Sequence, residues 1–331
     1  MQASVVVPTH GGAHRLPDLL AALATQDFNG EWELLIVVDG VVDDSAQVVA
    51  RWADRLPVRV LVHQTSVGVV AALNDAFSQA LGAVLIRCDD DLTPGPDFVR
   101  RHVAHHGERA DIGVIGPTRD VFPDTPYAIA YGRPATERSL LAAYARADDQ
   151  RWVGWAANNS LHRDAWACSG GFDPRFVYGQ DSELGWRLAH LCGVTLVVDP
   201  ALQVDHRGPS TSASTRIPRA YVSGASKRLF SVVHPEVRAE PPRPRGMRAR
   251  TWTSLVGGFS RLVTSKRGFE RVGKAVDRLL VVLPVAAGNS VVALCVEAAG
   301  RSGMRHGSDD LAVYKAQKAT ERSHELLRGV R

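Results

Sequence analysis

Three adjacent aspartates, Asp89, Asp90 and Asp91, follow a short apolar run at residues 83–86. Neighbouring carboxylates repel one another, and the end of a buried strand is a poor place for three of them unless a cation is bound there. On an extended segment Asp89 and Asp91 point to the same side, which suits two oxygen ligands of one ion. A divalent metal that holds a phosphorylated ligand meets these conditions. A solvated acidic turn is the simpler alternative.

The elements before this triplet must position it, and apolar spacing predicts strands and helices in alternation. The predicted strands cover residues 4–7, 34–38, 58–62 and 83–86, and the predicted helices cover residues 16–24, 45–55 and 68–81. Buried strands that alternate with helices are typical of a parallel α/β sheet, in which ligands bind at the carboxyl ends of the strands. Asp39 also follows a predicted strand. We therefore expect Asp39 and the aspartate triplet to face one crevice.

The chain of 331 residues has a net charge of +4, and its two parts carry net charges of opposite sign. Residues 1–226 contain 19 Lys and Arg against 26 Asp and Glu, a net charge of −7, whereas residues 227–331 contain 20 against 9, a net charge of +11. Three prolines between residues 240 and 246 cannot continue a helix or a central strand. We predict a catalytic domain at residues 1–230, with halves at 1–115 and 116–230. A Pro/Arg-rich linker at 231–250 and a basic helical extension at 251–331 follow.

The cysteines and the N-terminus bear on the cellular compartment. The four cysteines fit neither a disulfide scaffold nor a zinc-binding spacing, so we expect reduced thiols. The first residues lack the pattern of a secretory signal. The expected location is therefore the cytoplasm, with association to a membrane as an alternative.

The basic extension contains 18 uncharged residues, 279–296, which is the length at which a membrane span is suspected. Pro284, Gly288 and Asn289 lie inside this segment and weaken that interpretation. A helix or helical hairpin packed on the body, or one forming a homodimer, is the favoured prediction. Peripheral contact with an anionic membrane through residues 271–305 is the second. Nucleic-acid binding is not predicted, because the basic residues do not alternate with aromatic ones and form no known motif.

Several ordered motifs in residues 3–115 resemble the nucleotide-binding half of family 2 glycosyltransferases. Pro8-Thr9 ends the first predicted strand, Asp39-Gly40 ends the second, and Asp89 and Asp91 form a D-x-D motif. The resemblance implies the GT-A fold, a Rossmann-like and mostly parallel sheet flanked by helices. It also implies inverting transfer of a sugar from a nucleoside diphosphate donor.

The second half of the body is similar to the acceptor-side block of galactosyltransferase-like members of this family. A Gly-Gly-Phe-Asp turn at residues 170–173 precedes Gln180-Asp181, and Glu183 follows before a Trp-Arg-Leu sequence. Val204-Asp205-His206 resembles a late element whose histidine completes the metal shell. The resemblance covers residues 3–230.

The resemblance implies a role for each of these residues. Asp181 would be the general base, Gln180 and Glu183 would contact the acceptor, and Mn²⁺ or Mg²⁺ would be held by Asp89, Asp91 and His206. The donor, with uridine as the expected base, would contact a set of residues from both halves: Pro8, Thr9, Asp39, Asp89, Asp90, Gly154 and Trp155. The acceptor would offer a hydroxyl on a glycan, a lipid-linked molecule or a natural product.

Each assignment has an alternative from simple physical chemistry. Asp181 could serve only as a partner of a helix N-terminus, and Asp39 could cap a turn. His206 could be a surface histidine, and Trp155 could belong to the core. No G-x-G-x-x-G motif follows Gly11-Gly12, which excludes a dinucleotide-binding site. A nucleotidyltransferase, suggested by Arg15 in the first loop, remains open, as does a non-catalytic glycan- or membrane-binding scaffold.

Overall fold

The computed structural model describes residues 1–107, 109–237 and 246–307, and they fall into two compact units. Among the described residues, the first unit comprises Met1–Val121 and Arg138–Gly208, and the second comprises Phe122–Glu137 and the residues from Pro209 to Gly307. Residues 209–230, which we assigned to the catalytic domain, thus group with the C-terminal helices. The predicted linker at residues 231–250 begins inside a helix that ends at Val233, and residues 238–245 of it lie outside the described part of the chain.

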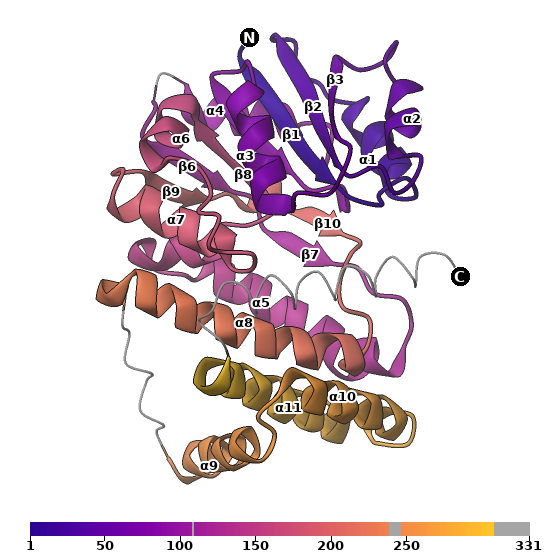
Figure 1. Cartoon of the computed structure of the whole chain (residues 1–331), viewed down its shortest axis with the longest axis vertical. Coiled ribbons are helices and arrows are strands. Elements are labelled where there is room, and N and C mark those ends of the chain that lie inside the picture. Colours follow the sequence, from indigo (N-terminus) through magenta and orange to yellow (C-terminus); the bar gives the residue numbers. More distant parts are fainter. Residues whose placement is uncertain (108, 238–245, 308–331) are drawn as a thin grey trace. The chain divides into compact units, whose positions relative to one another are not determined.

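A seven-stranded sheet forms the centre of the first unit (Figure 1). Its strands lie in the order β3-β2-β1-β4-β8-β6-β9, and β8 runs antiparallel to both of its neighbours. The strands are β1 (Ala3–Thr9), β2 (Trp32–Asp39), β3 (Val58–His63), β4 (Val84–Cys88), β6 (Ile112–Ile115), β8 (Asn158–His162) and β9 (Thr195–Val198). The predicted α/β class with a mostly parallel sheet is therefore confirmed.

Helices cover both faces of this sheet because successive strand residues point to opposite sides. Val5 and Val7 of β1 pack in one core cluster with residues of α1, α2 and α4, whereas Val6 packs in the other with residues of α3 and α7. The helices and helical turns of the unit, apart from the shared α5, are α1 (Leu16–Leu23), α2 (Ser45–Ala50), α3 (Val69–Gln79), α4 (Phe98–His106), η2 (Asp148–Gly154), α6 (Arg163–Ser169), α7 (Gln180–His190) and η3 (Pro200–Leu202).

A second, three-stranded sheet joins distant parts of the first unit. It contains β5 (Leu92–Thr93), β10 (Val204–His206) and β7 (Thr118–Asp120), with β10 in the middle. His206 is paired with Leu92 on one side and with Asp120 on the other. This register places His206 beside the residue that follows Asp91, although 115 positions separate Asp91 and His206 in the sequence.

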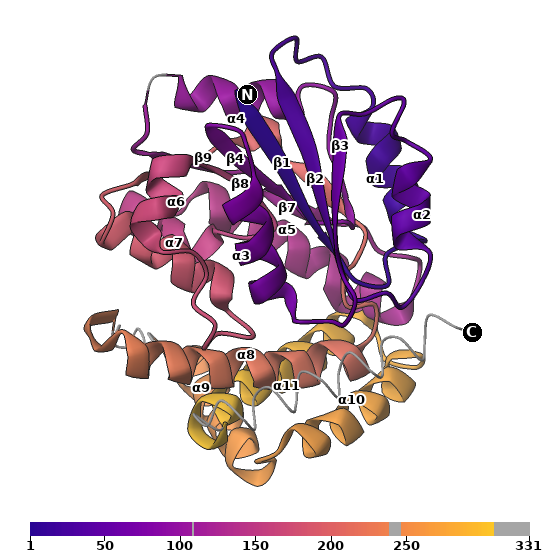
Figure 2. The ribbon, with the colours of Figure 1, turned by 45° about the horizontal axis from the view of Figure 1, so that its top comes forward.

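The second unit is helical and has its own core (Figure 2). Its long helix α8 packs against both α10 and α11, and Phe269, Val292 and Ala299 are among the fully buried residues. The helical elements are η1 (Ala128–Gly132), α5 (Arg133–Tyr144, shared with the first unit), α8 (Ala213–Val233), η4 (Pro235–Val237), α9 (Met247–Leu262), α10 (Lys266–Leu280) and α11 (Val285–His306).

The uncharged segment at residues 279–296 is not one continuous helix. A turn at residues 281–284 separates α10 from α11, as expected for a helical hairpin with Pro284 at the start of its second helix. Among the described residues, no helix is long and apolar enough to cross a membrane.

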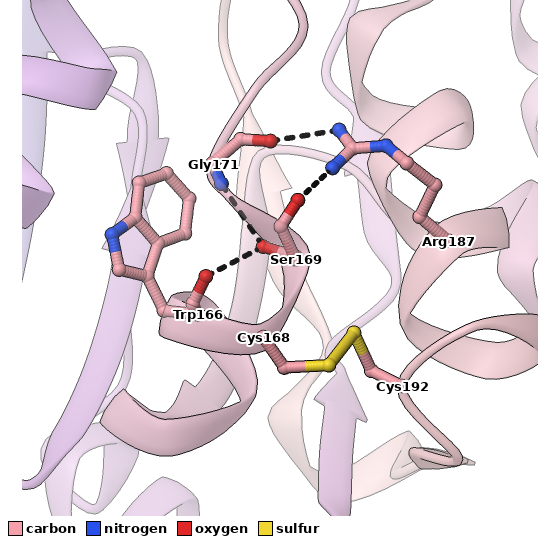
Figure 3. The surroundings of a disulfide bond; sticks show 6 residues. All are labelled: Trp166, Cys168, Ser169, Gly171, Arg187 and Cys192. Carbon is pink, nitrogen blue, oxygen red and sulfur yellow. Dashed lines mark hydrogen bonds between the residues drawn. A yellow bond between two sulfur atoms is a disulfide. The ribbon is translucent and has the colours of Figure 1, made fainter.

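Cys168 and Cys192 form a disulfide, so the prediction that all four thiols are reduced is wrong for this pair (Figure 3). The 24-residue separation carries no signal of pairing, because only the packing of α6 against α7 brings their ends together. The Cα atoms are 5.9 Å apart, within the usual range for a disulfide. Cys88 and Cys295 are buried free thiols. The cytoplasmic location remains a prediction.

Candidate active site

The carboxyl end of β1 is joined to the aspartate triplet through Asp90. Thr9 Oγ1 donates a hydrogen bond of 2.6 Å to Asp90 Oδ2, and the Arg15 guanidinium binds both Asp90 oxygens at 2.8 and 3.0 Å. A Cβ atom at Gly12 would lie 2.0 Å from Thr9 Oγ1, so the turn between β1 and α1 tolerates only glycine there. Asp90 therefore holds this turn in place. The neighbouring Pro8 is a partly buried residue of β1.

Asp39 at the end of β2 is occupied by the chain itself. Its carboxylate accepts hydrogen bonds from the Val67 and Gly68 backbone N–H groups, at 2.6 and 2.9 Å, and from the Ser66 hydroxyl at 2.8 Å. The residue is only 2% exposed. These contacts fit the capping alternative and leave Asp39 little surface for a donor. His10, which follows β1, approaches the Asp39 carbonyl, so the ends of β1 and β2 are adjacent as expected.

Asp89 and Asp181 are joined by a buried arginine that the sequence analysis did not single out. Arg87 of β4 binds both oxygens of Asp89, at 2.8 and 3.0 Å, and donates a further hydrogen bond to Asp181 Oδ1 at the start of α7. The Arg87 side chain is 3% exposed, whereas the Asp89 and Asp181 side chains are 26% and 23% exposed. Arg87 also lies over the Phe172 ring. The predicted metal ligand and the predicted base thus share one cation.

A signal for Arg87 was present in the sequence. A charged residue inside an otherwise apolar strand must find a partner when it is buried. Residues 87 and 89 are two apart on an extended chain and therefore share a side. The position of Asp181 beside them, 94 residues away, had no such signal.

Asp91 and His206 lie together, as the resemblance predicts for two metal ligands. His206 Nε2 is 3.2 Å from Asp91 Oδ2, and His206 Nδ1 is 2.6 Å from Asp120 Oδ1. Two donor atoms at this spacing, one imidazole nitrogen and one carboxylate oxygen, fit a single ion such as Mn²⁺. Asp120 was not predicted, and it fixes the orientation of the ring in the manner of a partner behind a ligand. Among the described residues, no group of three or more His, Cys, Asp or Glu side chains is placed to hold a metal ion by itself. A bound phosphate would have to supply further oxygens.

Burial and charge shift the pKa values of these groups. Removal from water, opposed by Arg87 and assisted by Asp91 and Asp181, raises the pKa of Asp89 to about 6. Although burial lowers it, the two carboxylates beside His206 raise its pKa to about 10. His206 lowers the pKa of Asp91, against the effect of burial. The cluster is thus arranged to hold positive charge at two points, Arg87 and His206, and at His206 a metal ion would take the place of the proton on Nε2.

A cavity of about 310 Å³ opens beside this cluster. Its lining combines Asp90 and Asp91 with the cationic side chains of Arg15 and Arg207. Arg207 is held by Thr93 Oγ1 and by Asp18, at 3.1 and 3.2 Å. Because Arg15 binds Asp90, its position is explained without the triphosphate chemistry of a nucleotidyltransferase. Carboxylates beside arginines suit a metal-bound diphosphate.

The two residues predicted to contact the acceptor, Gln180 and Glu183, are both buried. Glu183 is fully buried and forms a two-point ion pair with Arg187, at 2.7 Å for both contacts, so it is held inside the protein. Arg187 also binds the carbonyls of Ser169 and Gly171, which fixes the turn before α7 (Figure 3). Gln180 is 9% exposed, and its amide nitrogen is 3.5 Å from Asp181 Oδ2.

Trp155 and Gly154 do not form a sugar platform. Trp155 is 1% exposed and packs in the core between the sheet and α7, where a Cβ at Gly185 would lie 2.6 Å from its own Cβ. Its ring was predicted to contact the donor, and its burial argues for the core alternative instead. Gly154 is the last residue of η2.

The fold and the acidic strand ends define the class. A mostly parallel sheet with carboxylates at the ends of β2 and β4 has the arrangement of GT-A proteins. Two solved structures have the same fold: the mannosyltransferase PcManGT of Pyrobaculum calidifontis, solved with GDP-Man and Mn²⁺, and residues 1–349 of Staphylococcus aureus TarS, solved with UDP-GlcNAc. They reach TM-scores of 0.60 and 0.51 at 17% and 15% identity. Each alignment covers 90% of this chain, together with 86% of the first structure and 90% of the second.

Sequence comparison then gives the family. Residues 4–155, slightly less than half of the chain, match the model of glycosyl transferase family 2. A curated relative, the undecaprenyl-phosphate 4-deoxy-4-formamido-L-arabinose transferase of Pseudomonas fluorescens, is 32% identical over 130 residues. That match covers 38% of this chain and 37% of the relative, so the chain spans less than two fifths of that relative's length. The family resemblance is therefore confirmed, and the family model ends before Asp181.

Proposed function

We propose that the protein is a metal-dependent, inverting glycosyltransferase. It would move a sugar from a nucleoside diphosphate, with uridine as the expected base, to an acceptor hydroxyl. The observation that carries this proposal is two groups at the end of β4: Asp91 beside His206, and Asp89 joined to Asp181 through Arg87. The family match to residues 4–155 supports the donor side of the proposal.

Asp91 and His206 would hold the metal, with Asp89 close by on the same strand end. A bound Mn²⁺ or Mg²⁺ offsets the negative charge that appears on the diphosphate as it leaves. Arg15 and Arg207 line the adjoining cavity and would bind phosphate oxygens. Asp90 and Asp39 would act indirectly, by fixing the turns that follow β1 and β3.

Asp181 would accept the proton of the acceptor hydroxyl as its oxygen attacks the anomeric carbon. The carbon–oxygen bond to the diphosphate breaks as the new glycosidic bond forms, and attack opposite the leaving group inverts the configuration. Arg87 binds Asp181 Oδ1, which leaves Oδ2 as the oxygen for the proton. General-base assistance of this kind contributes roughly 10²–10⁴-fold.

Arg87 would be a positioning residue. It orients Asp181 through the hydrogen bond that it donates to Oδ1. Because the same guanidinium binds Asp89, the base on α7 is held at a defined place relative to the metal-binding strand end.

The chemistry of the acceptor is inferred from Asp181 rather than from the relatives. The relative's name specifies undecaprenyl phosphate, but its match covers only 38% of this chain. A phosphate acceptor is already anionic and needs no base. Asp181 at the cluster therefore favours a hydroxyl acceptor, whether on a glycan, a lipid-linked molecule or a natural product.

A donor screen tests the proposal. The purified protein is incubated with a panel of nucleotide sugars and Mn²⁺, Mg²⁺ or a chelator, and released nucleoside diphosphate is measured. We expect slow, metal-dependent release from one donor, and loss of that release in His206→Ala. Binding or release that is equal in the presence of chelator would contradict the metal site. Pyrophosphate release from a nucleoside triphosphate, with no release from any sugar donor, would favour a nucleotidyltransferase.

A further inference from the structure

Helix α10 of the second unit, labelled in Figure 2, has one buried and one exposed face. One face contributes buried residues to the helical core: Phe269, Gly273, Val276 and Leu280. The other carries four exposed cations at spacings of four, three and four residues, so they form a single line along the helix. We name this line the basic stripe; its members are Arg267, Arg271, Lys274 and Arg278.

The acids of α10 do not neutralise the basic stripe. Asp277 accepts hydrogen bonds from the Ala213 and Ser214 N–H groups at the start of α8, at 2.7 and 3.0 Å. Glu270 lies 3.9 Å from Lys266, outside the stripe. In the part of the chain that the structure describes, the members of the stripe make no ion pair with an acidic side chain. The helix therefore presents uncompensated positive charge to solvent.

The basic stripe ends at an exposed apolar turn, which we name the apolar tip (residues 279–287). No residue of the tip is charged or has a polar side chain. Val281 and Val282 are 72% and 77% exposed, and Leu279 and Val285 are 48% and 55% exposed. Isolated exposed apolar residues are ordinary on a protein surface, but a continuous run of them at one turn indicates a contact surface.

The positive charge beside the apolar tip indicates which kind of partner could bind this surface. In a symmetric dimer formed tip to tip, the two stripes would face each other and repel. An anionic bilayer is complementary to both features, because its headgroups attract Lys and Arg while its interfacial region accepts apolar side chains. The chain has no described helix that could span a membrane, so the contact would be peripheral.

We propose that the apolar tip and the basic stripe together dock the protein on the surface of an anionic lipid membrane. The tip would enter the headgroup region, and the stripe would lie along the headgroups. This inference goes beyond the proposed sugar transfer and does not depend on it, since docking requires neither donor nor metal.

Vesicle sedimentation of the full chain tests the docking. Vesicles of phosphatidylcholine alone are compared with vesicles that also contain phosphatidylglycerol, at low and high salt. We expect binding to the anionic vesicles that weakens with salt. The double variant Val281→Ser/Val282→Ser and the double variant Arg271→Glu/Lys274→Glu should each lower the partition coefficient roughly tenfold or more.

Matched controls separate the site from general charge and hydrophobicity. Arg51→Glu/Arg138→Glu makes the same change in net charge at exposed positions outside the stripe, and Leu191→Ser removes an exposed apolar side chain outside the tip. Both should bind vesicles within about twofold of the wild type, since neither touches the docking surface. Donor release in solution, measured without vesicles, should be unchanged in the tip and stripe variants.

Three results would overturn the docking. These are no binding of the wild type to anionic vesicles, equal losses in the control variants, or a lipid-free dimer that Val281→Ser/Val282→Ser dissociates. Vesicle binding without donor release would leave the docking intact and reject the proposed transfer. Donor release without vesicle binding would do the reverse.

Discussion

The donor side and the acceptor side of the first unit hold their acids by different means. On the donor side, the ends of β1, β2 and β4 are brought together by parallel strand pairing, and Asp39 is held by backbone N–H groups. On the acceptor side, residues 163–192 are held by long side chains and a covalent bond. Arg187 fixes the turn before α7, and Cys168–Cys192 joins the two ends of the segment.

This difference predicts which parts of the first unit tolerate substitution and which do not. Backbone pairing depends weakly on the identity of any one side chain, whereas a buried guanidinium between two carboxylates depends on that residue alone. Arg87 joins the two sides, since it binds Asp89 at a strand end and Asp181 on the acceptor helix. Substitutions on the acceptor side and at Arg87 should therefore have the larger effects, and the following predictions are ordered accordingly.

The largest effect should come from Asp181→Asn. An amide cannot take the acceptor proton, so transfer should fall by roughly 10²–10⁴-fold while donor affinity stays near that of the wild type. The measurement is kcat of transfer together with donor binding by calorimetry. The control Asp164→Asn removes a highly exposed acid of the same segment and should retain activity. Full activity in Asp181→Asn would refute the assignment of the base.

Arg87→Met should strongly destabilise the first unit. It leaves two carboxylates at a partly buried site without their cation, which costs about 3–5 kcal/mol in comparable buried pairs. Urea unfolding measures the loss. The double variant Arg87→Met/Asp181→Asn should lose less stability than the two single changes together, because they act on the same contact. Additive losses would show that Arg87 and Asp181 are not coupled.

The conservative variant Arg87→Lys tests whether Arg87 has a positioning role. Arg87→Lys keeps the charge without the two-point geometry, so it should recover much of the stability but less of kcat. Equal recovery of both quantities would mean that charge alone matters at this position.

Removal of the disulfide should have a smaller effect on stability. Cys168→Ser/Cys192→Ser frees a segment with a sequence separation of 24 residues, and chain entropy predicts a loss of about 3 kcal/mol. The free energy of unfolding is measured with and without reductant. The wild type should respond to reductant and the double variant should not. A wild type that is indifferent to reductant would show that the bond does not stabilise the folded state.

The most gradual effect should be a loss of stability in mild acid. Burial lowers the pKa of His102 to about 3 and that of His106 to about 4, and both rings contact Ser160 on β8. In the unfolded chain these histidines bind protons below about pH 6.5, which the folded protein resists. Their contribution is therefore complete above about pH 6.5 and declines as the pH falls below that value.

Urea midpoints at about pH 7.5, 6 and 5 measure this decline. His106→Gln should flatten the pH dependence, whereas His14→Gln, at an exposed position, should leave it unchanged. An equal slope in wild type and His106→Gln would exclude His106 as a source of the acid sensitivity.

The sequence predicted the fold well because strand and helix periodicities are local properties. The predicted strand at residues 34–38 is the centre of β2, and the predicted helix at 68–81 contains α3. The same locality explains why Asp39 and the aspartate triplet were expected at one edge, since parallel strands order their own carboxyl ends. The resemblance to family 2 paired Asp91 with His206, and the two lie 3.2 Å apart.

Other features were decided only by tertiary packing. Trp155 and Glu183 were predicted to contact ligands, yet one is in the core and the other pairs with Arg187. The Cys168–Cys192 bond and the Arg87–Asp181 contact join segments whose distance in the sequence gives no hint of contact. Hydrophobic spacing fixes which face of an element is buried, and so the sequence by itself determined the sheet, the helices and the acidic strand ends. Which charged groups meet depends on how those faces are stacked, and only the folded chain determines that.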